Sequence, residues 1–231
     1  MQWVFLHAFP LDRRMWTAEI ERFGASAYAP TLYGLGESMD AWAETVLARA
    51  PNEPLVVVGC SIGGSCALEM ARQAPERIAA LVLVGASATH RPDPADRDRY
   101  LEATRSGSAD GAWSALEDRL FSREPDAAVV EHAASIARQQ DGDDLMRAIR
   151  AFHSRRDVID VVATWDGPLF VVSGDADPFV PPAKTHATVA KSVRGTARIV
   201  PGCGHYVNLE RPAEFARILS DVARVVDADA L

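Results

Sequence analysis

A series of short apolar runs alternates with helix-like segments along this chain, and this alternation restricts the possible folds. The clearest run, Leu55–Val58, is a leucine followed by three valines, which is typical of a strand buried on both faces of a parallel sheet. Strands are predicted at residues 3–6, 27–29, 55–58, 81–84, 169–172 and 197–200, and helices at 17–23, 39–49, 63–73 and 215–226. This alternation predicts an α/β fold with a parallel sheet of about six strands and helices on both faces.

One long interval, from Ala88 to Thr164, breaks the alternation. It has no convincing strand and contains amphipathic patches around Leu145, Ile149 and Phe152, after a cluster of proline and charge at residues 91–94. We interpret it as a helical insertion between two core strands. The predicted organisation is a core of residues 1–87 and 165–231 with an insertion of residues 88–164, which suits a 231-residue chain.

Charge and hydropathy exclude several classes of partner. The formal net charge is −8, whereas nucleic-acid surfaces and polybasic membrane anchors need clustered Lys and Arg. No apolar stretch approaches the ~20 residues that span a bilayer, and the first residues lack a basic leader. We therefore expect a cytoplasmic protein with no nucleic-acid or membrane partner.

The strongest chemical signal is the segment Gly59-Cys60-Ser61-Ile62-Gly63, between the 55–58 run and a predicted helix. It has the form G-x-S-x-G in a strand–turn–helix context, where a tight turn exposes the serine and only small residues fit two positions away on either side. A helix N-terminus behind the serine favours a developing negative charge. The pattern predicts Ser61 as a nucleophile.

The neighbouring Cys60 is the rival nucleophile. Shifting the motif by one residue would put Val58 and Ile62 at the positions that need small residues, so Cys60 is predicted to pack beneath the turn and Cys66 within the helix. With Cys203 the chain has three cysteines, which do not form a disulfide framework, and we expect reduced thiols.

A serine nucleophile needs a base and an acid that orients it. His205 follows the last predicted strand in the loop Gly202-Cys203-Gly204-His205, and its flanking glycines let the imidazole reach the site. The loop after the penultimate strand offers two acids, Asp175 and Asp177. Asp177 lies farther out and is the favoured partner of His205, whereas Asp175 is the alternative, or binds loop amides.

The site also needs backbone N–H groups that stabilise an oxyanion. The amide of Ile62, directly after the nucleophile, is one candidate, and the amide of Phe9 in the loop His7-Ala8-Phe9-Pro10 is the other. His7 is predicted to brace this loop. The candidate pocket residues are the aromatic side chains of Trp113, Phe121, Phe152, Phe179 and Tyr206, each of which is equally compatible with core packing.

Taken together, the G-x-S-x-G turn, the H-x-F-P loop, the G-D-x-D-x-x-x-P loop and the G-x-G-H loop resemble the α/β-hydrolase superfamily over nearly the whole chain. The most similar branch is that of the small serine esterases and enol-lactonases, which includes pimeloyl-carrier-protein methyl ester esterases. The resemblance implies an α/β-hydrolase fold, with residues 88–164 as a helical cap over the pocket. Members usually carry a hairpin before the first strand found here; its absence would leave a sheet edge bare or paired with a second molecule.

The expected function is hydrolysis of a small or medium carboxylic ester through Ser61, His205 and Asp177. An enol-lactonase or C–C bond hydrolase with the same triad is the alternative within enzymes. A ligand-binding receptor with very slow turnover is the alternative of another class. The chain lacks nucleotide-binding loops and metal-site motifs, so no cofactor and no metal are expected.

Overall fold

The computed structural model describes residues 1–90 and 93–229, so Arg91 and Pro92 of the proline-rich cluster lie outside the described residues. A sheet of six strands has the order β2-β1-β3-β4-β5-β6, and every neighbouring pair is parallel. The strands are β1 (Gln2–Leu6), β2 (Ala27–Tyr28), β3 (Leu55–Cys60), β4 (Ile78–Val84), β5 (Leu169–Gly174) and β6 (Gly195–Val200). The predicted parallel α/β architecture is confirmed.

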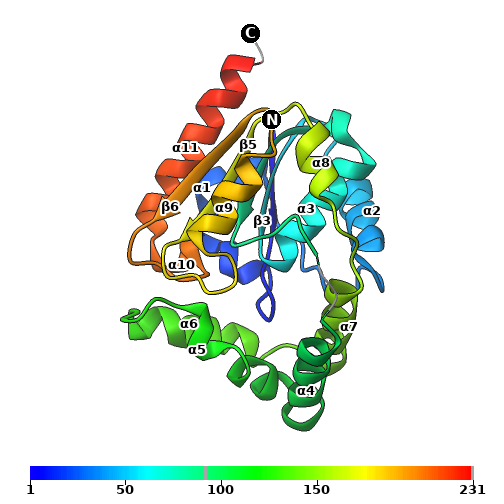
Figure 1. Ribbon diagram of the computed structural model, residues 1–231, viewed down its shortest axis with the longest axis vertical. Helices are drawn as coiled ribbons and strands as arrows, with labels where there is room; N and C mark the ends of the chain where they lie inside the picture. The colour runs from blue at the N-terminus through cyan, green and yellow to red at the C-terminus, as the bar shows by residue number, and fades with distance from the viewer. Residues whose placement is uncertain (91–92, 230–231) are drawn as a thin grey trace.

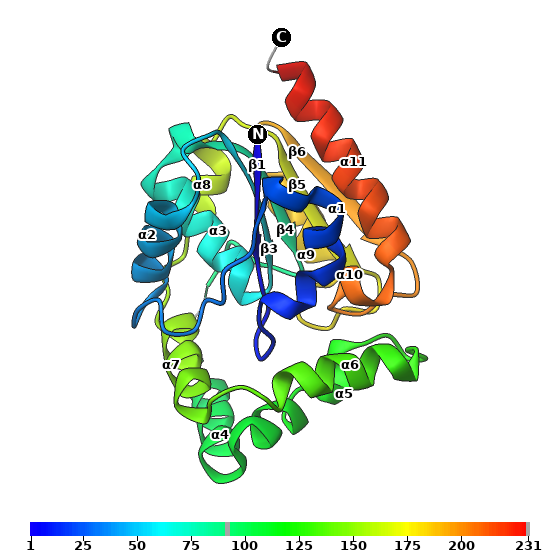
Figure 2. The same ribbon diagram turned by 180° about the vertical axis from the view of Figure 1, so that it is seen from behind.

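Helices cover both faces of this sheet (Figures 1 and 2). The core helices are α1 (Thr17–Phe23), α2 (Met39–Arg49), α3 (Ile62–Gln73), α9 (Pro182–Val189), α10 (Val207–Glu210) and α11 (Pro212–Asp229). Helices α2, α3 and α9 lie on the face turned to the viewer in Figure 1, and α1 and α11 lie on the opposite face, seen in Figure 2. The 17–23 and 39–49 predictions match α1 and α2, while the last helix extends beyond 215–226 at both ends.

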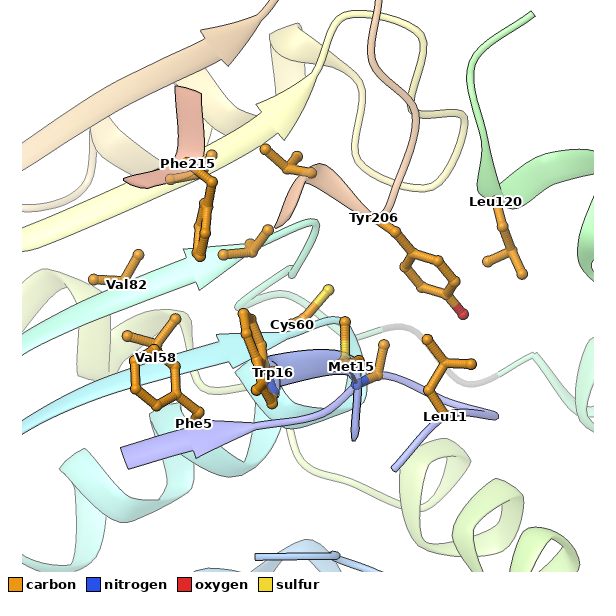
Figure 3. Packing of buried hydrophobic residues seen from close by; sticks show 14 of the residues in the cluster. Phe5, Leu11, Met15, Trp16, Val58, Cys60, Val82, Leu120, Tyr206 and Phe215 are labelled. Carbon is orange, nitrogen blue, oxygen red and sulfur yellow. Dashed lines mark hydrogen bonds between the residues drawn. The ribbon is translucent and has the colours of Figure 1, made fainter. Parts of the chain in front are cut away.

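The strands divide their side chains between two apolar cores. In β3, Val56 and Val58 join one core and Leu55 and Val57 join the other, and all four side chains have no solvent exposure. Figure 3 shows the first core, where Phe5, Trp16 and Phe215 pack against valines of the sheet. Because successive strand residues point to opposite faces, a strand covered on both sides must be apolar throughout, which explains the unbroken 55–58 run.

The interval between β4 and β5 is helical in the described residues. Its helices are α4 (Pro94–Ser114), α5 (Glu117–Leu120), α6 (Ala127–Ala137), α7 (Gly142–His153) and α8 (Ile159–Thr164). Helices α4 to α7 lie beyond the carboxyl ends of the strands, whereas α8 lies beside α3 (Figures 1 and 2). Val161 and Val162 of α8 are buried in the second core. Residues 159–164 belong to the predicted insertion, and the apolar face of α8 packs on the core helix α3.

Side-chain contacts attach the cap to the core at its α6 end. Arg14, before α1, donates to the side chain of Gln139 at 2.6 Å and to the carbonyl oxygen of Ile136 at 3.4 Å. Gln140 in turn donates to Asp12 at 2.9 Å, and Asp12 also binds the Arg14 guanidinium. This group of residues fixes the cap over the loop that follows β1.

The strand order creates a crevice at the carboxyl edge of the sheet. The chain moves from β1 outward to β2 and then returns to β3 on the other side of β1. In open parallel sheets, such a reversal between neighbouring strands is where ligands bind. The loops after β1 and β3 carry Phe9 and Ser61, so the fold brings these two residues to the crevice. In the described part of the chain, no helix has the length and apolar character needed to cross a membrane.

Candidate active site

Ser61 lies on a strained turn between β3 and α3. Its backbone has φ 52° and ψ −114°, a left-handed conformation that is costly for a residue with a side chain and that clusters at functional sites. A Cβ atom at Gly59 would lie 2.4 Å from the carbonyl oxygen of Gly63, and one at Gly63 would lie 2.2 Å from that of Leu6. Both distances are far below van der Waals contact. The turn therefore requires glycine on both sides of Ser61, as the sequence motif predicted.

The side chains of Ser61 and Cys60 have different surroundings. Ser61 lines a cavity of about 230 Å³ that lies under the cap. Cys60 has no solvent exposure and belongs to the first core, and burial raises the pKa of its thiol well above the usual value. A buried thiol with a raised pKa is a poor nucleophile because the thiolate is the reactive form. All three cysteines are free and buried.

His205 and Asp177 form a buried pair. The Nδ1 atom of His205 lies 2.8 Å from Oδ2 of Asp177, and the two residues are 3% and 2% exposed. The other carboxylate oxygen of Asp177 accepts from the backbone N–H groups of Phe179 and Val180, at 2.8 and 3.1 Å. Because Nδ1 is bonded to Asp177, Nε2 is the ring nitrogen available to a second partner. His205 and Ser61 line the same cavity.

The pKa of Asp177 reflects opposing effects. Burial alone would raise the pKa of this carboxyl, but the His205 imidazole and the two amides outweigh burial and hold it below its usual value. Asp175, the rival acid, is exposed and accepts from the backbone N–H of Cys203 at 3.3 Å. The structure therefore brings Asp177 to His205 and leaves Asp175 bound to a loop amide.

The loop after β1 is held from two sides. The Nε2 atom of His7 accepts from the N–H of Leu32 at 2.8 Å, and its Nδ1 lies 3.0 Å from the carbonyl oxygen of Ala8. Burial lowers the pKa of His7 to about 4, so the ring is neutral at pH 7. The hydroxyl of Tyr206 donates to the carbonyl oxygen of Phe9 at 2.8 Å. These contacts fix the Phe9 backbone at the cavity.

Phe9 and Ile62, the two candidate oxyanion residues, both line the cavity. Ile62 is the first residue of α3, where a backbone N–H has no acceptor within its own helix. Within residues 1–90 and 93–229, the Phe9 N–H has no hydrogen-bond acceptor either. Two residues whose backbone N–H groups are candidate oxyanion donors therefore line the same cavity as Ser61.

Sequence reasoning missed two residues that support the histidine loop. Gly85, with φ +53°, follows β4, and a Cβ atom there would lie 2.8 Å from the imidazole of His205. Glu210 is buried, and its carboxylate accepts from the N–H groups of Gly204 at 2.7 Å and of Ser122 at 2.9 Å. A glycine directly after a strand was the available signal for Gly85. The sequence gives no signal for Glu210, because its partners come from distant segments.

The structure brings only part of the predicted aromatic set to the cavity. Phe152 and Phe179 line the cavity, but Trp113, Phe121 and Tyr206 do not. Phe121 packs between the other two, with ring centroids 6.1 Å from Trp113 and 5.6 Å from Tyr206. These three rings fill the junction between the cap and the histidine loop, so their apolar area is used in packing.

Comparison with known proteins identifies the family of the chain. The model of the alpha/beta hydrolase family matches residues 3–218. The pimeloyl-[acyl-carrier protein] methyl ester esterase of Aromatoleum aromaticum is 35% identical over 92 residues, which are 36% of this chain and 36% of that protein. The protein of that name from Hamiltonella defensa is 32% identical over 96 residues, 38% of this chain and 37% of that protein. The chain thus matches little more than a third of the length of these curated relatives.

Solved structures resemble the whole chain. A thermophilic esterase from Thermogutta terrifontis, solved with malate bound, has a TM-score of 0.89 and 24% identity, covering 98% of this chain and 90% of that one. An esterase from Exiguobacterium antarcticum has a TM-score of 0.84 and 16% identity, covering 97% and 92%. At these identities the likeness shows the shared fold.

Proposed function

The chain belongs to the alpha/beta hydrolase family, and on this basis we propose that it is a serine hydrolase that cleaves a small or medium carboxylic ester. The observation that carries the proposal is the buried His205–Asp177 pair, 2.8 Å apart, beside a cavity that a strained Ser61 also lines. A nucleophile, a base and an orienting acid in this relation suit acyl transfer.

In the first step, Nε2 of His205 takes the hydroxyl proton of Ser61 while Oγ attacks the ester carbonyl carbon. The carbonyl π electrons move to oxygen, and the amides of Phe9 and Ile62 stabilise that oxyanion. Asp177 holds the imidazole in the required tautomer and stabilises its cation. The intermediate then collapses, the proton on His205 passes to the alkoxide, and the alcohol leaves an acyl-enzyme.

In the second step, His205 removes a proton from water, and the resulting attack releases the carboxylic acid and restores Ser61. No redox change occurs, and water supplies the only additional atoms. The cavity of about 230 Å³ supports a small or medium substrate. The names of the two curated relatives also favour an ester bond.

The test measures hydrolysis of p-nitrophenyl acetate and butyrate by the wild type, Ser61→Ala and Cys60→Ala. We expect Ser61→Ala to lower kcat by at least about a thousandfold, because removal of the nucleophile disables the whole triad. Cys60→Ala should retain activity, because this thiol lies outside the cavity. Equal rates for the wild type and Ser61→Ala would refute the proposal.

A fluorophosphonate probe separates an enzyme from a slow-turnover receptor. Labelling should occur once per chain and map to Ser61 by peptide mass spectrometry. The labelled fraction should equal the fraction of activity lost. Stoichiometric labelling without steady-state turnover of any ester would favour the receptor.

A further inference from the structure

One end of the cavity carries two cationic side chains. Arg155, in the loop between α7 and α8, and Lys184, on α9, both line the cavity, and both are half-buried. The whole chain has a net charge of −8, so this local positive charge runs against the overall balance. The structure therefore concentrates cations where a substrate would bind.

The guanidinium of Arg155 is held in place without a carboxylate. Its Cζ atom lies 3.6 Å from the ring centroid of Phe152, and it donates to the carbonyl oxygen of the same residue. Among the described residues, no carboxylate lies within ion-pair distance of Arg155. An arginine stacked on an aromatic ring keeps the remaining edge of its planar fork free, which suits bidentate binding of an anion.

The neighbouring carboxylates are engaged elsewhere. Asp96 lines the cavity but forms an ion pair with Arg99. The charge of Asp157 raises the pKa of Arg155, but the two residues form no ion pair. The two carboxylate oxygens of Asp157 accept hydrogen bonds from the backbone N–H groups of His90 and Ile159. Asp177 is paired with His205. In the part of the chain that the structure describes, neither Arg155 nor Lys184 has a carboxylate within ion-pair distance.

Burial disfavours both charges, and the charge of Arg155 further disfavours that of Lys184. Burial lowers the pKa of Arg155 to about 10, and burial and then the charge of Arg155 lower the pKa of Lys184. Half-buried like charges are unfavourable unless an anion compensates them. An anionic group between the two side chains would remove the repulsion and make charge-assisted hydrogen bonds.

We infer that Arg155 and Lys184 form an anion subsite, and that the substrate is an ester that also carries a carboxylate. This inference rests on the proposed function. The p-nitrophenyl esters used in the test carry this carboxylate at the end of the acyl chain. A carboxylate matches the planar guanidinium fork, and a terminal phosphonate, which presents similar oxygens, serves as the competing anion in the test.

The test compares p-nitrophenyl hemiesters of adipate with analogues that end in a neutral primary amide or in a phosphonate. We expect the wild type to prefer the carboxylate over the amide by about tenfold or more in kcat/KM, the usual effect of one charge-assisted hydrogen bond. Arg155→Gln should abolish most of this preference and Lys184→Gln should reduce it. Arg150→Gln, which removes an exposed cation of α7, is the matched control and should keep it.

The possible failures are distinguishable. If the amide ester is cleaved in a Ser61-dependent manner and the wild type shows no preference, the subsite is refuted and the hydrolase proposal stands. A preference for the phosphonate over the carboxylate would refute the carboxylate assignment. If no ester is cleaved, calorimetry of adipate binding to Ser61→Ala decides: binding that Arg155→Gln weakens supports the subsite, and the absence of binding refutes it.

Discussion

The backbone N–H of His205 donates a hydrogen bond to the carbonyl oxygen of Leu120, with 2.9 Å between the two atoms. Leu120 is the last residue of α5, so the cap directly supports the loop that carries the proposed base. Glu210 extends the connection, because its carboxylate accepts from Gly204 of the histidine loop and from Ser122 of the cap. The position of the imidazole therefore depends on the docking of the cap.

The first prediction concerns Glu210→Gln. The two amides bind different oxygens of Glu210, and glutamine places an NH2 donor where one of these oxygens lies. The loss of a charge-assisted bond in a buried site costs about 1–3 kcal/mol. We expect lower stability in urea unfolding and a lower kcat with little change in KM. The control Glu214→Gln affects a more exposed carboxylate whose partner is Arg217, and should change neither. Wild-type kcat in Glu210→Gln would show that the loop is positioned without this bridge.

The second prediction separates the two acids. Asp177→Asn should lower kcat by about 10³–10⁴-fold, because an amide neither stabilises the imidazolium nor fixes its tautomer. Asp175→Asn should keep most of the activity, since Asp175 is exposed and binds only a loop amide. Steady-state kinetics on p-nitrophenyl butyrate measures both variants. A larger loss in Asp175→Asn would reverse the assignment.

The third prediction addresses the anchor of the Phe9 loop. Tyr206→Phe removes the hydroxyl that donates to the Phe9 carbonyl oxygen at 2.8 Å, and frees the loop that presents one proposed oxyanion donor. We expect kcat to fall by about tenfold, part of the effect of losing such a donor altogether, while KM stays similar. Tyr28→Phe, on the edge strand β2, should behave as the wild type. An unchanged kcat in Tyr206→Phe would indicate that His7 alone fixes the loop.

The fourth prediction is a pH dependence of stability from Glu19 on α1. Burial raises the pKa of this carboxyl to about 7, from an ordinary value of 4.5. Between these values the folded state binds more protons than the unfolded state, so the Glu19 contribution to stability falls as pH rises. Glu19→Gln removes this penalty. Its stability advantage should be small at pH 5 and reach about 2–3 kcal/mol above pH 7.

Urea unfolding of the wild type and Glu19→Gln at pH 5 and pH 8 provides the measurement. Other groups that titrate in this range, including His7, cancel in the difference between the two proteins. The matched control is Glu21→Gln, an exposed position on the same helix, where the difference should not vary with pH. A pH-independent difference for Glu19→Gln would show that this carboxyl ionises normally.

The features predicted from the sequence are those with local causes. The pattern of short runs identified all six strands. The signal is strongest in the central strands β1, β3, β4 and β5, because a strand between two helix layers must be apolar on both faces, whereas the edge strands β2 and β6 are only partly buried. The sterics of a tight turn identified Ser61 and rejected Cys60, since the required glycines lie two residues away. The histidine loop and the order of the motifs were likewise readable along the chain.

Other features depended on contacts between distant segments. The sequence favoured Asp177 over Asp175, but only the fold shows which carboxylate meets His205. Apolar character alone does not distinguish a residue that lines the cavity from one that packs in the core, so core packing stayed an equal alternative for Trp113 and the two rings that pack with it. Local sequence patterns could not identify Glu210, because its hydrogen-bond donors come from two different loops.

Patterns along the chain were enough to predict the parallel α/β architecture, the turn that carries Ser61 and the set of loops that could supply a base and an acid. Tertiary packing brings Asp177 to His205, joins the cap to the histidine loop, and places Arg155 and Lys184 in the lining of one cavity. Backbone conformation and burial periodicity act over only a few residues. The geometry of a site depends on where packing places side chains that lie far apart in the chain.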